Sequence, residues 1–403
     1  MTEQPLEPAA EEDDERPRLL SVEIADWPGL GGAVRLELDP RRTLLIGKNG
    51  AGKSLIVEGL YRAAQQACVG LSYEPPGPGY FRCDVSLGGS PFAYEYRILR
   101  KETDEEEDVA ISERPTRERT ASWFERAWRL TDGFELWRID EASISLPSVE
   151  KRVPFTPGTG LVSTLKATDP PAPPNGLWDL LHGIRIVSAG IPRRDISGRK
   201  EILVRGVHRP KGRRWVPQVR SDRAQALAAT MVSNWEQRRE LSDEVIALLQ
   251  QLGLVKDVTI KVYEDPGAGP EGERVDYAAV LFDGTNLGLL SDGTLRVTEI
   301  VIDLLRPGVS CLLVEEPETA VHPGLLNKLL SLMESYSLDR QIVLSTHAPH
   351  IVDRFLPAQV RLVEREGGAT SMRSLDKEEC ARITQYLDDE GTFSDYLFGC
   401  STG

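Results

Sequence analysis

The sequence predicts an α/β fold in which two distant segments of one chain combine into a single core. A glycine-rich loop follows an apolar strand near residue 46, and two acidic residues end another apolar strand near residue 315. In the last quarter of the chain, short apolar strands alternate with helical segments, which is typical of a parallel sheet covered by helices. The region between the two segments lacks this alternation and is predicted to be a mixed α/β insertion.

Composition limits the class of protein. The chain has 403 residues, enough for two or three domains, and a net charge of −15, which disfavours a constitutive nucleic-acid coat. The five cysteines form no C-x-x-C pair, so we expect a reducing, cytoplasmic location and no structural zinc site. No apolar stretch approaches the length of a membrane span, and the acidic N-terminus does not resemble a signal peptide, so we expect no membrane association.

The chain is expected to contain five regions. They are a disordered acidic tail (1–17), an N-terminal core part with an antiparallel β subdomain (18–109), the insertion with a proline-rich connector and a basic segment (110–283), a C-terminal core part (284–365) and an extension (366–403). Residues 110–190 show no clear periodicity, although Trp123, Trp128 and Trp137 indicate a packed region.

Hydrophobic periodicity predicts the elements in order. We expect strands at 19–24, 33–38 and 43–46, a helix at 54–68, antiparallel strands at 81–87 and 92–99, a short helical pair within 221–252, strands at 258–263 and 275–282, a helix from Thr294, a strand ending at Glu315, a helix at 324–336, a strand ending before His347 and a strand at 360–363. In the helical pair, Leu227, Met231 and Trp235 share a face, Ser242 is the expected N-cap of the second helix, and Gly253 is its expected stop.

The glycine-rich loop spans residues 47–54 and has the spacing of a phosphate-binding P-loop. Glycines allow successive N–H groups to face one point, and the following helix N-terminus favours an anion. We therefore expect ATP binding, with Lys53 at the β- and γ-phosphates and Ser54 as a ligand of Mg²⁺. The predicted nucleotide-binding residues of this loop are Gly47, Asn49, Gly50, Gly52, Lys53 and Ser54.

Two further strands end in residues suited to the same chemistry. In P-loop enzymes a carboxylate at the end of a neighbouring strand binds Mg²⁺, and Glu315 takes that position here. Glu316 is the expected general base for the attacking water, and His347 is the expected sensor of the γ-phosphate. The alternatives are a strand that simply enters solvent and a capping or core histidine.

A second anion site is predicted at the turn formed by Ser291, Asp292 and Gly293, because a hydroxyl and free N–H groups open a helix there. Such a site is useful if Ser291 and Gly293 face the P-loop of another subunit. Two chains would then enclose two ATP molecules.

This set of motifs resembles the ABC-class ATPases, with Walker A at 47–54, a signature at 290–294, Walker B at 312–316, a D-loop at 319–323 and a switch histidine at 347. The sequence at residues 315–323 and 345–349 resembles a narrower group of these ATPases, the RecF/SMC-like AAA-21/AAA-15 branch. That branch includes the ATPases of overcoming-lysogenization-defect (OLD) nucleases and of Septu and PARIS anti-phage systems. The resemblance covers 18–100 and 280–365. It implies an ABC-type head, ATP with Mg²⁺, ATP hydrolysis by a nucleotide-gated homodimer or higher homo-oligomer, and a separate nuclease or toxin effector.

The sequence departs from the usual ABC pattern at three points. Asp292 replaces the first signature glycine, and Glu315 replaces the usual aspartate. No glutamine is assigned to the Q-loop, since Gln65 and Gln66 lie on the predicted P-loop helix and Gln218 lies in a region without a clear pattern.

Two other functions stay open. One is a RecF-like DNA repair ATPase, and the other is the nucleotide-binding subunit of a transporter, which the altered signature and the long insertion disfavour. A basic cluster in the insertion bears on the first. Its residues, Arg209, Lys211, Arg213 and Arg214, fit a phosphate-backbone track, or else a solvated loop or a partner of the acidic tail.

Overall fold

The chain forms two compact units. A computed structural model describes residues 16–70, 76–100, 121–140, 143–145, 174–188, 201–208, 215–218, 223–268, 274–388 and 391–399. The first unit comprises Met1–Ile186 and Arg340–Gly403, and the second comprises Val187–Asp339. Strand β9 (Ile184–Val187) lies at the point where the chain passes from one unit to the other.

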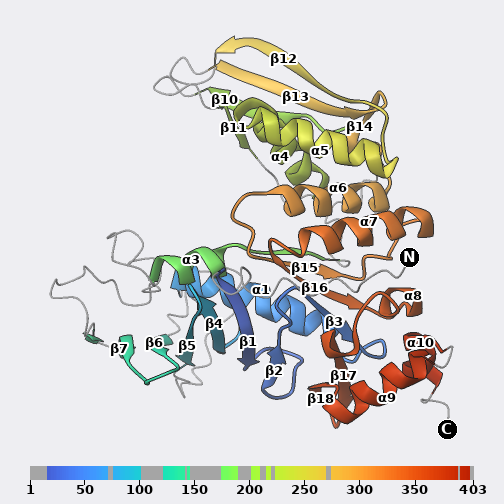
Figure 1. Ribbon diagram of the computed structural model, residues 1–403. Coiled ribbons are helices and arrows are strands. Elements are labelled where there is room, and N and C mark those ends of the chain that lie inside the picture. Colours follow the sequence, from blue (N-terminus) through green and yellow to red (C-terminus); the bar gives the residue numbers. More distant parts are fainter. Residues whose placement is uncertain are drawn as a thin grey trace, which may run out of the picture. The chain divides into compact units, whose positions relative to one another are not determined.

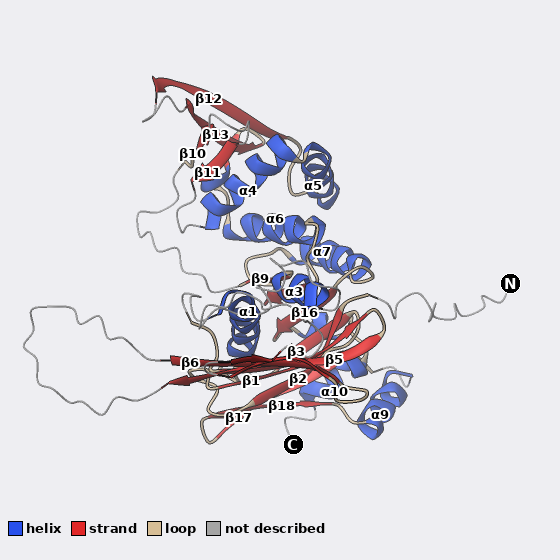
Figure 2. Cartoon of the chain, turned by 90° about the vertical axis from the view of Figure 1, so that its left-hand side faces the viewer, coloured by secondary structure: helices blue, strands red, loops and turns tan. Residues whose placement is uncertain are grey.

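A seven-stranded antiparallel sheet, in the order β2-β1-β4-β5-β6-β7-β8, forms much of the first unit (Figure 1). Its strands are β1 (Arg18–Ala25), β2 (Val34–Glu37), β4 (Tyr80–Leu87), β5 (Ser90–Arg100), β6 (Ala121–Arg129), β7 (Glu135–Asp140) and β8 (Ser143–Ser145). Phe81, Cys83 and Val85 alternate along β4 and are fully buried on one face of the sheet. Helices α1 (Lys53–Val69) and α3 (Pro174–His182) contact each other and cover this face, and Figure 2 shows α1 beside the sheet.

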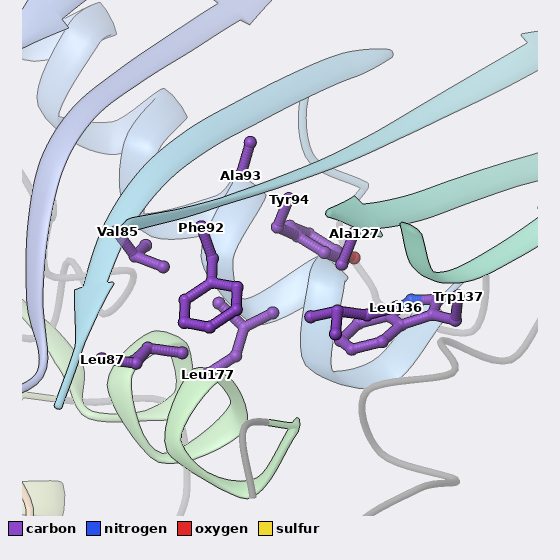
Figure 3. Close-up of a pocket in the computed structure, with 9 residues that line it drawn as sticks. All are labelled: Val85, Leu87, Phe92, Ala93, Tyr94, Ala127, Leu136, Trp137 and Leu177. Atoms are coloured by element: carbon purple, nitrogen blue, oxygen red, sulfur yellow. The ribbon is translucent and has the colours of Figure 1, made fainter. Parts of the chain in front are cut away.

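The tryptophans of the region without clear periodicity belong to this core. Trp123 and Trp137 are almost fully buried, and both indole N–H groups donate to the buried carboxylate of Glu125, over distances of 2.8 and 3.3 Å. The packed region that these residues predicted is therefore confirmed within residues 121–140, where it consists of strands β6 and β7. Close by, a small pocket lies between the sheet and α3, where Phe92 faces Leu177 (Figure 3). All nine lining residues are uncharged, so this pocket is not suited to a nucleotide.

The first unit also contains the strand that precedes the glycine-rich loop. Strand β3 (Arg42–Ile46) lies between β16 (Gln341–Thr346) and β17 (Val360–Glu366) and is parallel to both. Strand β18 (Ala369–Ser374) pairs antiparallel with β17 and completes this group at one edge. The remaining elements are α8 (Pro349–Val352), η4 (Pro357–Gln359), α9 (Lys377–Asp388) and α10 (Phe393–Gly399).

Within its described residues, the second unit combines an antiparallel sheet with four α-helices. The sheet order is β11-β10-β13-β12, with the short β14 paired to β13. The elements are β10 (Val204–His208), β11 (Trp215–Gln218), α4 (Arg223–Gln237), α5 (Arg239–Leu252), β12 (Val258–Ala268), β13 (Arg274–Phe282), β14 (Thr285–Asn286), η3 (Leu287–Leu289), α6 (Asp292–Leu305), β15 (Cys311–Glu315) and α7 (Pro323–Tyr336). Helix α4 packs on the sheet, and α5 contacts α4, α6 and α7 (Figure 1).

The predicted fold class is confirmed, since the chain is α/β with an antiparallel β subdomain and an insertion that contains a helical pair. Gly253 ends α5 with a positive φ of 76°, as its position predicted. The expectation for Ser242 was wrong, because α5 begins at Arg239 and Ser242 is buried inside the helix. The acidic tail from residue 1 to 15 and the basic cluster 209–214 lie outside the described residues.

Candidate nucleotide site

The glycine-rich loop connects β3 directly to α1, as the sequence predicted. Gly50 and Gly52 have φ values of 80° and 105°, which side-chain-bearing residues rarely adopt. A side chain on Gly47 would collide with the Val363 carbonyl, and one on Gly52 would collide with Thr370. Around Gly50, in contrast, an added Cβ would meet nothing within 4 Å. The loop is therefore packed against β17 and β18 on one side and is open at Gly50.

Lys53 is the first residue of α1 and is 6% exposed. Its Nζ donates to the carbonyl oxygens of Gly47, at 2.7 Å, and Lys48, at 3.3 Å. The ammonium group therefore lies within the loop. Ser54 is exposed in the first turn of the helix, where a hydroxyl can reach a cation beside a bound anion.

His347 directly follows β16, the strand next to β3. The parallel register pairs Thr346 with Ile46, so Gly47 and His347 begin the loops at two adjacent strand ends. The Thr346 hydroxyl accepts a hydrogen bond from the Ala348 N–H at 3.0 Å, which fixes the backbone around the histidine. The His347 side chain is exposed, so it is not the core histidine that was the alternative.

Glu315 is the last residue of β15, in the second unit, and is 3% exposed. Its Oε2 accepts a hydrogen bond from the Ser188 hydroxyl, and its main-chain carbonyl accepts one from the Arg296 guanidinium. Its Oε1 is buried and has no hydrogen-bond partner among the described residues. An unsatisfied buried carboxylate oxygen is costly, and it is the kind of ligand that Mg²⁺ prefers. Glu315 therefore fits the predicted metal ligand.

Glu316 has a φ of 42°, a left-handed conformation that is uncommon for a glutamate. A turn stabilises it, because the Thr319 N–H donates to the Glu316 carbonyl at 2.9 Å and the Thr319 hydroxyl lies 3.3 Å from Glu316 Oε2. Strained backbone of this kind is often found at functional sites, where the surrounding structure maintains it.

The predicted signature opens α6. Ser291 is the N-cap, and its hydroxyl accepts from the Thr294 N–H at 3.2 Å. Gly293 is buried against the turn after Glu316, where a side chain would collide with the Ala320 carbonyl. This close contact is a sufficient reason for a glycine at position 293, whether or not the residue binds a nucleotide. Asp292 is exposed in the first turn of α6, where a carboxylate is favoured by the helix dipole.

The structure brings the predicted residues together in two groups. Gly47, Asn49, Gly50, Gly52, Lys53, Ser54 and His347 belong to the first unit, and Ser291, Gly293, Glu315 and Glu316 belong to the second. Within the second group, the contact of Gly293 with Ala320 connects the signature to the turn that carries Glu316.

Three residues that contact Glu315, directly or through Ser188, were missed by sequence reasoning. They are Ser188, Arg223 and Arg296. Burial lowers the pKa of Arg296, and the nearby Arg223 guanidinium lowers it further. The available signal was Arg296 itself, a charged residue among apolar residues near the start of a helical segment. No comparable signal exists for Ser188, since a serine after a short strand is common.

Two of the three glutamines considered for a Q-loop make structural contacts. Gln65 donates to the Ile184 carbonyl at 3.3 Å, and the Gln66 amide oxygen accepts from the Gly77 N–H at 2.5 Å. Gln218 is the last residue of β11.

Among the described residues, no helix has the length and apolar character needed to span a membrane.

The chain is similar in part to one protein family and to several solved structures. Residues 233–353 match the protein family described as "AAA domain, putative AbiEii toxin, Type IV TA system", which is less than half of the chain. No curated protein sequence matches. Among solved structures, an SMC head bound to the C-terminal winged-helix domain of ScpA is 12% identical, with a TM-score of 0.43, and the match covers 91% of this chain and 99% of that one.

Two further SMC head structures match in the same way. An SMC head with an extended coiled coil, bound to the C-terminal domain of ScpA derived from Pyrococcus furiosus, is 12% identical with a TM-score of 0.40, and the match covers 92% of this chain and 100% of that one. The SMC head from Thermotoga maritima is 12% identical with a TM-score of 0.36, covering 89% and 99% respectively.

Proposed function

We propose that this chain is an ABC-type ATPase that binds Mg-ATP and hydrolyses it to ADP and phosphate. The observation that carries the proposal is the loop between β3 and α1, in which Lys53 Nζ already lies among the loop carbonyls. The buried Glu315 with its unsatisfied Oε1 and the AAA match over residues 233–353 support the same function.

Each residue then has a distinct task. The loop N–H groups and Lys53 bind the triphosphate, and Ser54 and Glu315 are the residues that would bind Mg²⁺. When bound, the metal would neutralise phosphate charge and orient the terminal phosphate. Glu316 accepts a proton from the attacking water, and His347 contacts the terminal phosphate from the strand end beside the loop. All of these residues must meet at one nucleotide for hydrolysis.

Nucleotide binding is tested by Lys53→Ala, with Lys48→Ala as the matched control in the same loop. Lys48 is exposed, whereas Lys53 is buried at the helix start. We expect Lys53→Ala to weaken ATP binding at least about tenfold in calorimetry, because a charge-assisted contact to phosphate is lost. Lys48→Ala should bind as the wild type does. Equal affinities for all three proteins would refute the P-loop assignment.

We propose further that two chains enclose two ATP molecules, with Ser291 and Gly293 of one chain facing the P-loop of the other, and that this dimer regulates a separate nuclease or toxin effector in the cytoplasm. The match to the family described with the AbiEii toxin is the observation that favours an effector function over DNA repair or transport. The exposed position of Ser291 at the start of α6 favours a shared nucleotide site.

Mixing experiments test the shared site. Ser291→Arg should bind ATP but not hydrolyse it, because the bulky side chain would obstruct the nucleotide of the partner. A mixed dimer with Lys53→Ala has one site with both lesions and one site with neither. Random mixing in equal amounts should restore up to about a quarter of the wild-type rate, since half of the dimers are mixed and each has one intact site. No recovery from demonstrated mixed dimers would contradict shared sites.

A further inference from the structure

A chain of polar contacts leads from the insertion to the carboxylate of Glu315. The last contact in this chain is the hydrogen bond from the Ser188 hydroxyl to Glu315 Oε2. Ser188 directly follows β9, and β9 and β15 are separated by more than a hundred residues of sequence. The bond occupies one carboxylate oxygen and leaves Oε1 without a partner among the described residues.

Arg223 fixes the backbone of Ser188. This arginine is the first residue of α4, and its guanidinium donates to the Ser188 carbonyl oxygen. The same guanidinium forms an ion pair with Glu299 of α6, with 3.1 Å between Nε and Oε2. The two side chains are 16% and 24% exposed, so water screens this pair only in part. Arg223 therefore connects a helix of the insertion, the segment after β9 and the signature helix.

The hydrogen bond from Ser188 can orient the carboxylate of Glu315. A carboxylate with one oxygen bound to a fixed hydroxyl presents its other oxygen in one direction. Partners behind a metal ligand typically change metal affinity 10–100-fold when they are removed. A planar guanidinium can bind the Ser188 carbonyl and the Glu299 carboxylate at the same time, whereas a lysine ammonium has a less suitable geometry for this.

We propose that Arg223 is a positioning residue for the metal ligand Glu315, acting through Ser188, so that the insertion adjusts the affinity of the nucleotide site for its divalent cation. This inference rests on the proposed function, in which Glu315 binds the metal of the ATP complex. The alternative is that Arg223 only joins α4 to α6, in which case its removal lowers stability without a specific effect on the metal.

The test measures Mn²⁺ affinity of the ATP complex by electron paramagnetic resonance, ATP affinity in EDTA by calorimetry, and the thermal midpoint. The variants are Arg223→Gln and Arg223→Lys. The matched control is Arg239→Gln, because Arg239 pairs with Asp243 on the exposed surface of α5 and contacts none of these residues. We expect Arg223→Gln to weaken Mn²⁺ binding about tenfold, Arg223→Lys to weaken it less, and both to keep the ATP affinity in EDTA. Arg239→Gln should match the wild type in all three measurements.

Arg223→Gln protein with wild-type Mn²⁺ affinity would overturn the inference. So would equal losses of Mn²⁺ affinity and ATP affinity in EDTA, since that pattern indicates general damage. The milder Arg223→Lys variant gives the same comparison if Arg223→Gln does not fold. A double-mutant cycle with Glu299→Gln adds a second check, because Glu299 should affect Mn²⁺ binding only while Arg223 is present.

Failure of the proposed function would look different. Wild-type protein that binds no ATP, with or without Mn²⁺, would refute both the function and this inference. Wild-type protein that binds Mn-ATP, combined with an unchanged Arg223→Gln, would refute the inference alone.

Discussion

The predicted site residues form two groups, the phosphate half in the first unit and the carboxylate half in the second, and the two groups are built in different ways. The phosphate half is local, since β3, the loop and α1 form one continuous segment, and Lys53 bonds to carbonyls of Gly47 and Lys48. The carboxylate half is assembled from a distance, since Glu315 contacts Ser188 and Arg296, and Ser188 in turn contacts Arg223. Local geometry is determined by glycine positions, whereas the distant contacts depend on the packing of the insertion.

This difference predicts two classes of variants. Changes in the phosphate half should reduce ATP affinity whether or not a metal is present. Changes in the carboxylate half should leave metal-free ATP binding intact and alter metal affinity, hydrolysis or stability. A variant of the second class that lost metal-free ATP binding would show that the two halves are not separate in function.

The largest effect is expected for Glu316→Gln. The amide keeps the size of the side chain and can remain near Thr319, but it cannot accept a proton from water. We expect ATP affinity within about threefold of the wild type and a hydrolysis rate reduced at least about 100-fold. Calorimetry and single-turnover hydrolysis measure the two quantities. A variant that hydrolyses ATP at the wild-type rate would remove Glu316 from the role of base.

The same difference explains what could be read from the sequence. The P-loop, β15 and the helical pair were predicted, because glycine spacing and hydrophobic periodicity are properties of short segments. The contacts of Ser188 and Arg223 were not predicted, because they join residues that are far apart in the sequence, namely 188, 223, 299 and 315. No short sequence motif indicates such contacts. Strands β6 and β7 were missed since their tryptophans, arginines and glutamates obscure the alternation, although Trp123 and Trp137 lie on the buried face.

Ser242 illustrates the opposite error. Serine followed by acidic residues is a typical helix start, yet here α5 already begins at Arg239. The side chain of Ser242 is buried instead of capping. Tertiary packing of the helical pair therefore outweighed a local signal, as it often does for helix boundaries.

The carboxylate half should also carry a pH dependence of stability, through Glu299. Burial raises its pKa from 4.5 to about 7, against the opposing effect of Arg223, and Asp303 raises it further while Arg296 and Arg306 lower it. A carboxyl with a raised pKa in the folded state binds its proton more tightly there than in the unfolded chain. Its contribution to stability is complete below about pH 4.5 and is lost as the pH rises to about 7.

Glu299→Gln removes this proton and keeps the shape of the side chain. The stability of the wild type relative to Glu299→Gln should therefore fall between pH 5 and pH 8, by at most about 3 kcal/mol. Urea unfolding of both proteins at the two pH values measures the difference. If the difference between the proteins is independent of pH, Glu299 does not titrate in this range.

The smallest effect is expected at Gly293, where the signature meets the turn after Glu316. An alanine there would place its methyl group against the Ala320 carbonyl, so either the start of α6 or the turn must shift. Overpacking of this kind typically costs about 1–3 kcal/mol, and Ala320 is already in a left-handed conformation with a φ of 61°. We expect Gly293→Ala to lower the thermal midpoint and to slow hydrolysis, with metal-free ATP binding unchanged.

Gly324→Ala is the matched control, because Gly324 lies at the start of α7 and its added methyl group would meet only ordinary contacts with His322. That control should be neutral or slightly stabilising, since alanine favours a helix over glycine. If Gly293→Ala is as stable and active as Gly324→Ala, the contact between the predicted signature and the turn does not constrain the carboxylate half, and the glycine at 293 needs another explanation.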